Sequence, residues 1–165
     1  MNLLRLSLLF FSLYSFSGQI KFIESFDEFT DERTVSLGLL GDENNSFNNE
    51  MIAVVCETEK IATLGISKGI IFNLNNNLLV TMRFDKKEPI KKNFTFNSSA
   101  QVLYTKDTNF IKLFLKELKD ANNLILKIQG ETGVMRFTDL TSFELEVDKF
   151  EKASSKMQSC NLFYS

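Results

Sequence analysis

Residues 78 to 85 read Leu-Leu-Val-Thr-Met-Arg-Phe-Asp, and this short stretch is the clearest indication of the fold class. Its apolar side chains recur at every second position, which is the spacing of a strand that buries one face. They are Leu78, Val80, Met82 and Phe84. Arg83 and Asp85 then lie on the opposite face, and we predict a half-buried β-strand here.

The same alternation, in runs rich in β-branched and aromatic residues, continues along much of the chain. It predicts further strands over residues 35–39, 51–57, 61–66, 101–104, 124–129 and 134–138. Gly130 and Gly133 frame a turn between the last two strands, which indicates a hairpin. A connection this short favours antiparallel pairing.

Two segments have helical spacing instead. In residues 108–121 the apolar side chains fall at helical intervals, with Asp107 or Thr108 as the N-cap. Residues 142–157 carry a second apolar stripe after the cap residue Ser142. This stripe consists of Phe143, Val147, Phe150 and Met157. We therefore predict an α+β fold: a mostly antiparallel sheet or sandwich with two amphipathic helices packed on it.

Three stretches between these elements are polar or ambiguous. Residues 22–29 fit a helix and a strand equally well. Residues 41–49 are rich in asparagine and predict an exposed loop. Residues 86–93 surround the only proline, Pro89, and predict a basic surface loop, which is either a solvated connection or a contact for an acidic partner. Its lysines are Lys86, Lys87, Lys91 and Lys92.

The N-terminus has the pattern of a secretory signal peptide. Arg5 precedes an apolar run over residues 6–16, which the small-x-small triplet of Ser15, Phe16 and Ser17 closes. We predict a signal peptide over residues 1–18 and a single β-rich domain over residues 19–165 that is periplasmic or secreted. No later apolar run approaches the roughly 20 residues that span a bilayer, so we expect no stable membrane anchor.

Cys56 and Cys160 are the only cysteines of the chain. In an oxidising compartment, an isolated pair of this kind favours a structural disulfide. A redox-active pair is the less favoured alternative, because active dithiols usually lie close together in the sequence.

The chain contains no histidine, which removes whole classes of chemistry. Catalytic triads and histidine-based metal sites are excluded, whereas carboxylate chemistry, a lysine nucleophile and an all-oxygen calcium site stay open. Asp139 with Glu144, or Glu57 with Glu59, could form an acid–base pair, but any chain with 21 acidic residues offers such pairs. We predict no catalytic residues, no metal and no cofactor. The net charge of −2 gives no indication of nucleic-acid binding.

The tripeptide Met-Arg-Phe occurs twice, and it places Arg83 and Arg136 on the outward faces of two predicted strands. If those strands are neighbours, the two guanidinium groups could form an anion site. Salt bridges with surface acids are the alternative role.

The order of these elements resembles that of a known family. Asp31 precedes a strand at residues 34–39, a strand at 51–56 follows, and a helix near the C-terminus ends in Cys160. Arg83-Phe84-Asp85 and the cysteine pair are the most specific features. In this arrangement the chain resembles the VasI-like small exported bacterial proteins, a type VI secretion-associated accessory family with related envelope and phage-borne proteins. The resemblance implies a periplasmic, non-enzymatic, β-rich domain with one disulfide.

These observations together predict a non-enzymatic accessory or binding protein that contacts a protein partner in the cell envelope. One alternative is an inhibitor or immunity-type protein that blocks a hydrolase with the loop at residues 41–49. The other is a carboxylate-dependent envelope hydrolase. The sequence leaves the oligomeric state open.

Overall fold

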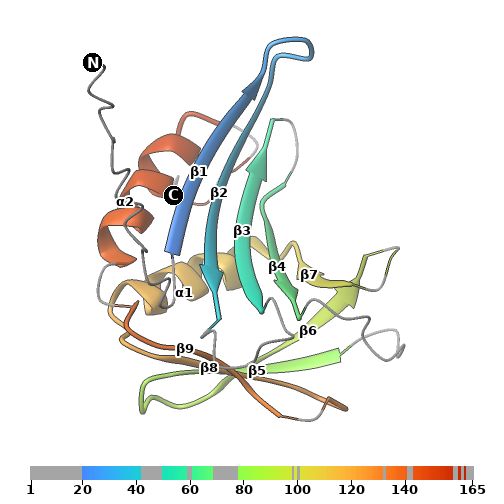
Figure 1. The fold of residues 1–165 in the computed structure, drawn as a ribbon, viewed down its shortest axis with the longest axis vertical. Coiled ribbons are helices and arrows are strands. Elements are labelled where there is room, and N and C mark those ends of the chain that lie inside the picture. Colours follow the sequence, from blue (N-terminus) through green and yellow to red (C-terminus); the bar gives the residue numbers. More distant parts are fainter. Residues whose placement is uncertain are drawn as a thin grey trace, which may run out of the picture.

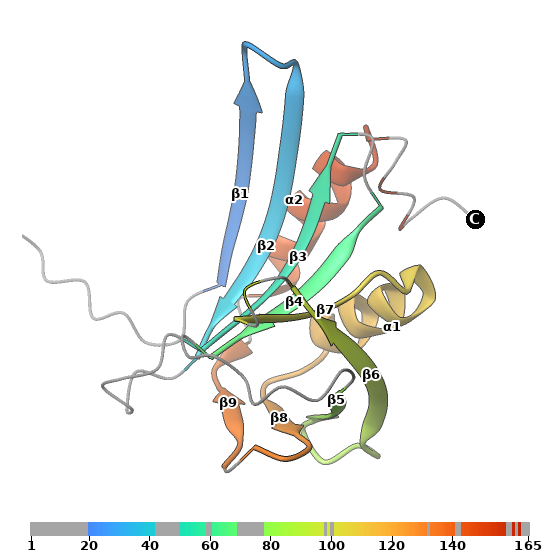
Figure 2. The same cartoon turned by 90° about the vertical axis from the view of Figure 1, so that its right-hand side faces the viewer.

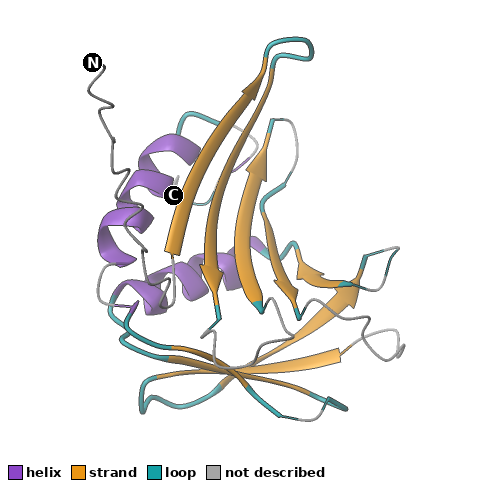
Figure 3. Cartoon of the chain, in the orientation of Figure 1, coloured by secondary structure: helices purple, strands orange, loops and turns teal. Residues whose placement is uncertain are grey.

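The computed structural model describes residues 20–41, 50–58, 61–68, 78–97, 99, 101–131, 133–140, 143–157, 160 and 162. Within them, nine strands form one antiparallel sheet against which two helices pack (Figure 1, Figure 3), so the predicted α+β class is confirmed. The strands are β1 (Ile20–Asp27), β2 (Glu32–Leu40), β3 (Met51–Glu57), β4 (Thr63–Ser67), β5 (Leu78–Phe84), β6 (Ile90–Phe96), β7 (Val102–Thr105), β8 (Leu124–Ile128) and β9 (Met135–Phe137), and the helices are α1 (Thr108–Lys119) and α2 (Phe143–Ser154).

The sheet is bent around the helices rather than flat. Its strand order is β1-β2-β3-β4-β7-β6-β5-β8-β9, and β5, β8 and β9 cross beneath the steeper strands β1 to β4 (Figure 1). Both helices lie on one side of β1 to β4 (Figure 2), where α2 contacts β1 and β2, and α1 contacts α2 and β4. The inner face of the sheet and the helices therefore enclose the core, and the outer face is free of both helices.

The core forms because alternate strand residues are apolar and point to the same side. In β5, Leu78, Val80, Met82 and Phe84 are buried, as the alternation predicts. Phe84 packs edge to face against Phe114 of α1, with ring centroids 5.8 Å apart. The buried face of α1 thus lies directly on the strand that indicated the fold class.

The ambiguous stretch at residues 22–29 forms most of strand β1 and the first half of the turn that follows it. β1 pairs with β2 along its whole length, from Ile20 opposite Leu39 to Asp27 opposite Glu32. This pairing places Phe22 on the inner face, where it packs against the core. Backbone pairing with a distant segment decides between two patterns that the local sequence leaves equal.

The predicted basic loop at residues 86–93 is wrong in its second half. Strand β6 begins at Ile90, so Lys91 and Lys92 lie within the sheet between β5 and β7. Pro89 precedes the strand, where it removes no hydrogen bond from the ladder. The face of β6 that carries Lys92 also packs on the core through Ile90, Phe94 and Phe96. The alternation of apolar residues is therefore present in the sequence, but Lys92 interrupts it.

Both predicted helices are present, and each ends two or three residues earlier than predicted. Asp107 caps α1, since its carboxylate accepts a hydrogen bond from the backbone N–H of Phe110. α2 ends at Ser154, so Met157 lies beyond the helix although its side chain is still buried. Gly130 and Gly133 have φ angles of 84° and 85°, as a turn at these glycines requires. The proposed cap Ser142, the signal peptide and residues 42–49 lie outside the described residues.

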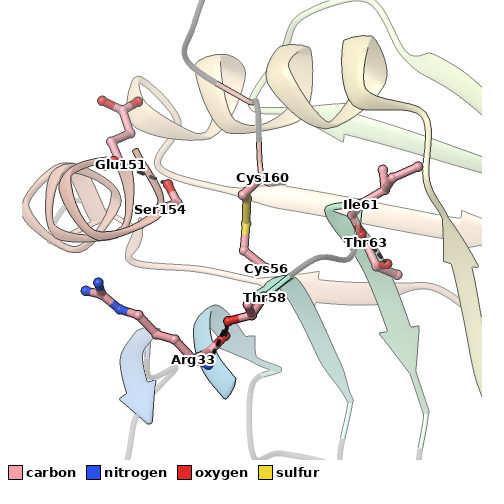
Figure 4. The surroundings of a disulfide bond; sticks show 8 residues. All are labelled: Arg33, Cys56, Thr58, Ile61, Thr63, Glu151, Ser154 and Cys160. Carbon is pink, nitrogen blue, oxygen red and sulfur yellow. Dashed lines mark hydrogen bonds between the residues drawn. A yellow bond between two sulfur atoms is a disulfide. The ribbon is translucent and has the colours of Figure 1, made fainter. Parts of the chain in front are cut away.

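The disulfide is present as predicted. Cys56 of β3 is bonded to Cys160 near the C-terminus, and their Cα atoms are 5.5 Å apart (Figure 4). Both side chains are buried. Next to the bridge, the Thr58 side chain accepts a hydrogen bond from the backbone N–H of Arg33 at 2.8 Å. The disulfide thereby links Cys160 to β3, an interior strand of the sheet.

Candidate functional site

The outer face of β5, β6, β8 and β9 brings together cations that are far apart in the sequence. Arg83 of β5 lies opposite Ile125 of β8, and Ile125 lies opposite Arg136 of β9. The two arginines are therefore not on neighbouring strands. They flank Ile125 on one face with Cα atoms about 10 Å apart, which is two strand spacings.

A second row of the same face adds two lysines. Thr81 of β5 lies opposite Lys91 of β6 on one side and Lys127 of β8 on the other. Arg83, Lys91, Lys127 and Arg136 are all exposed, and we call these four residues the basic face. The outward strand positions around them, within the described part of these four strands, contain no acidic residue.

The basic face gathers four cations whose charges are not neutralised, whereas several described lysines elsewhere are in ion pairs. In the part of the chain that the structure describes, none of its four members forms an ion pair. Two predicted contact lysines are engaged instead: Lys87 pairs with Glu117 at 2.7 Å, and Lys92 pairs with Asp107 and lies over the Phe110 ring. Six cations were predicted as contacts. Two of them, Lys87 and Lys92, are in ion pairs. The other four are in no ion pair among the described residues: Arg83, Lys86, Lys91 and Arg136.

A surface pocket of about 550 Å³ adjoins the basic face at the ends of β8 and β9. Lys86 and Arg136 supply cations to its lining, and Ile125 supplies an apolar side chain, whereas the side chains of Leu124 and Phe137 are buried in the core. Such a lining suits a group that is partly apolar and carries negative charge nearby.

Asp85 is the one acidic residue of this lining, and its carboxylate is already bound within the fold. It accepts hydrogen bonds from the backbone N–H groups of Asn122 and Asn123, at 3.2 and 2.9 Å. Desolvation by burial acts to raise the pKa of Asp85, but these hydrogen bonds and the nearby Lys87 outweigh it and hold the pKa below its ordinary value. Asp85 therefore organises the pocket rather than offering a free acid.

Lys127 was not identified from the sequence. Its signal was its position two residues after Ile125 in an alternating strand, which puts both side chains on one face. What made it part of the site, the pairing of β8 with β5, is a long-range contact that local pattern does not reveal.

The carboxylate pairs considered from the sequence do not form a described site. Asp139 follows β9 and is exposed, and Glu59 lies outside the described residues. No group of three or more cysteine, aspartate or glutamate side chains that could hold a metal ion is found among the described residues. No described helix is long and apolar enough to cross a membrane.

Comparisons of the chain with protein-family models, with curated proteins and with solved structures find no match. The chemistry of the basic face and its pocket is therefore the basis for a functional proposal.

Proposed function

We propose that this chain is an exported, non-enzymatic accessory or binding protein whose basic face contacts an acidic segment of a protein partner in the cell envelope. The observation that carries the proposal is the set of four unneutralised cations beside a partly apolar pocket. A chain with a net charge of −2 gathers these four cations on one face of the sheet, whereas several other described lysines pair with acids. Such a face steers an acidic partner toward it and selects its orientation.

The apolar part of the pocket favours a protein partner over a continuous polyanion. Ile125 lies between the two arginines, and it also lines the adjoining pocket. A polypeptide can offer carboxylates and an apolar side chain together, which is the usual mixture in a protein interface. A nucleic acid would present regularly spaced phosphates and would favour a more extended basic surface.

Export and the secretion-associated role are the remaining parts of the proposal. The N-terminal pattern at residues 1–18 supports export, and the Cys56–Cys160 disulfide suits an oxidising compartment. The resemblance to VasI-like proteins supports a role beside a secretion machine. In the periplasmic fraction of the host, the intact mass should lack the signal peptide and show the oxidised cysteine pair.

The basic face can be tested with a defined probe. A fluorescently labelled synthetic peptide, rich in glutamate and containing a single phenylalanine, should bind the protein in an anisotropy titration and weaken as salt rises. The double variant Arg83→Glu, Arg136→Glu should lose about tenfold or more in affinity. The control, Lys116→Glu with Lys152→Glu, makes the same charge change on the two helices and should bind like the wild type.

Equal binding by both variants would refute the assignment of the face. For the native partner, crosslinked pull-downs from the host envelope would compare the wild type with the same two variants. Recovery of a secretion machine that depends on Arg83 and Arg136 supports the accessory role. Recovery of one hydrolase in equal amount, with loss of its activity, would instead support the inhibitor.

A further inference from the structure

The β1–β2 hairpin carries the chemistry that the basic face would recognise. Four acidic residues surround its turn, and we call them the acidic tip. They are Asp27, Glu28, Asp31 and Glu32, all of them exposed. Within the described residues none of the four is in an ion pair, since Arg33, the nearby cation, pairs with Glu24.

Two phenylalanine side chains on the same hairpin are exposed to solvent. Phe29, in the turn, is 100% exposed, and Phe26 is 59% exposed. Burial of a phenylalanine side chain is worth about 1.5–3 kcal/mol, so exposure of both is a reason for association with another surface. A partner for this tip needs an apolar depression with cations around it.

The basic face and its pocket provide that combination. The pocket of about 550 Å³ has an apolar side chain, Ile125, in its lining, and Lys86 and Arg136 border it. Its volume is ample for one phenylalanine side chain. The acidic tip and the basic face therefore match in charge and in apolar character.

The tip cannot occupy the pocket of its own chain. The turn between β1 and β2 lies at one end of the long axis, and β5, β8 and β9 lie at the other (Figure 1, Figure 2). β1 and β2 are hydrogen-bonded along eight residue pairs, so the hairpin is a continuous extension of the sheet. Only a second molecule can bring the two surfaces together.

We infer that the acidic tip of one copy docks on the basic face of the next, with Phe29 in the pocket, so that copies assemble head to tail. This inference rests on the proposed function of the basic face, and names one occupant for it. The contact joins two different surfaces, so each added copy leaves one tip and one face free for further growth or ring closure. An acidic partner protein would compete for the same face and limit the assembly.

Two complementary variants test this assembly. The tip variant carries Glu28→Gln, Phe29→Ser and Asp31→Asn, and the face variant carries Arg83→Gln and Arg136→Gln. In sedimentation velocity at low ionic strength, the wild type should form species that grow with concentration, while each variant alone stays monomeric. An equimolar mixture should form 1:1 dimers that grow no further, because the dimer has no intact tip or face left.

A monomeric wild type, or a mixture that stays monomeric, would overturn the inference. So would wild-type oligomers that persist in the tip variant. Anisotropy with the glutamate-rich peptide on the same samples separates this failure from failure of the proposed function. Peptide binding by a wild type that does not self-associate removes only the head-to-tail assembly, whereas loss of peptide binding removes the role of the face itself. Circular dichroism verifies that both variants are folded.

Discussion

Asp85 accepts a hydrogen bond from the backbone N–H of Asn123 at 2.9 Å, and this contact joins the end of β5 to the residue before β8. The same carboxylate also accepts from the N–H of Asn122. Asp85 has a φ of 49°, a left-handed conformation that aspartate and asparagine tolerate better than most residues. One side chain thus fixes both the turn after β5 and the edge of the pocket.

We predict that Asp85→Ala lowers the free energy of unfolding by about 1–2 kcal/mol, because it removes these acceptors and strains the left-handed position. Asp85→Asn should lose less, since its amide oxygen can still accept and asparagine fits the same φ. Urea unfolding of the two variants checks this order. If alanine and asparagine are equally stable, the hydrogen bonds of Asp85 do not matter to the fold.

A second prediction concerns Asp107, the N-cap of α1. Its hydrogen bond with the Lys92 ammonium and that with the Phe110 N–H hold the pKa of Asp107 below its ordinary value of 3.8. A pKa that folding lowers means that the charged carboxylate stabilises the fold. This stabilisation is present above pH 3.8 and is lost as the pH falls through the lowered pKa.

Asp107→Asn can still cap the helix but does not titrate, so its stability should fall less steeply than that of the wild type below about pH 4. Asp107→Ala should lose about 1 kcal/mol at neutral pH, because the cap itself is gone. Urea unfolding across this pH range measures both effects. Parallel acid profiles for the wild type and Asp107→Asn would show that the carboxylate charge contributes nothing.

The sequence predicted correctly those elements whose local residue pattern matches the burial of their side chains in the fold. The strand at residues 51–57 was predicted with the bounds of β3, because Ile52, Val54 and Cys56 alternate without interruption between half-buried neighbours. Asp107 was one of two predicted caps, with Thr108, because such a residue before an apolar helical stripe is a local signal. In both places the local pattern and the tertiary burial agree.

The remaining features depend on contacts between distant segments. β6 was missed because Lys92 interrupts the apolar alternation. Lys92 can lie on the inner face of the sheet because its ammonium group pairs with Asp107, a contact between distant segments. The separation of Arg83 from Arg136 follows from the insertion of β8 between β5 and β9. Strand order is set by long-range pairing, so the sequence could place the arginines outward but not relative to each other.

A third prediction addresses the disulfide, which joins residues 104 positions apart. Closing a loop of about 100 residues restricts the unfolded chain by roughly 4–5 kcal/mol in the chain-entropy model. Cys56→Ala with Cys160→Ala should therefore lower the unfolding free energy by several kcal/mol, as measured by guanidinium denaturation. Reductant should destabilise the wild type and leave the double variant unchanged. A variant as stable as the oxidised wild type would show that the bridge is dispensable.

The final prediction separates the basic face from the lysine loop that the sequence indicated. Lys91 and Lys127 lie on the outer face opposite Thr81, whereas Lys87 and Lys92 are held by Glu117 and Asp107. Lys91→Gln with Lys127→Gln should weaken binding of the glutamate-rich peptide and reduce its salt dependence, because two free cations are lost. Lys87→Gln with Lys92→Gln removes the same charge but should leave peptide affinity within about twofold, at a cost in stability from the lost ion pairs. If the second pair weakens binding more than the first, the contact surface follows the chain around Pro89 and not the face of the sheet.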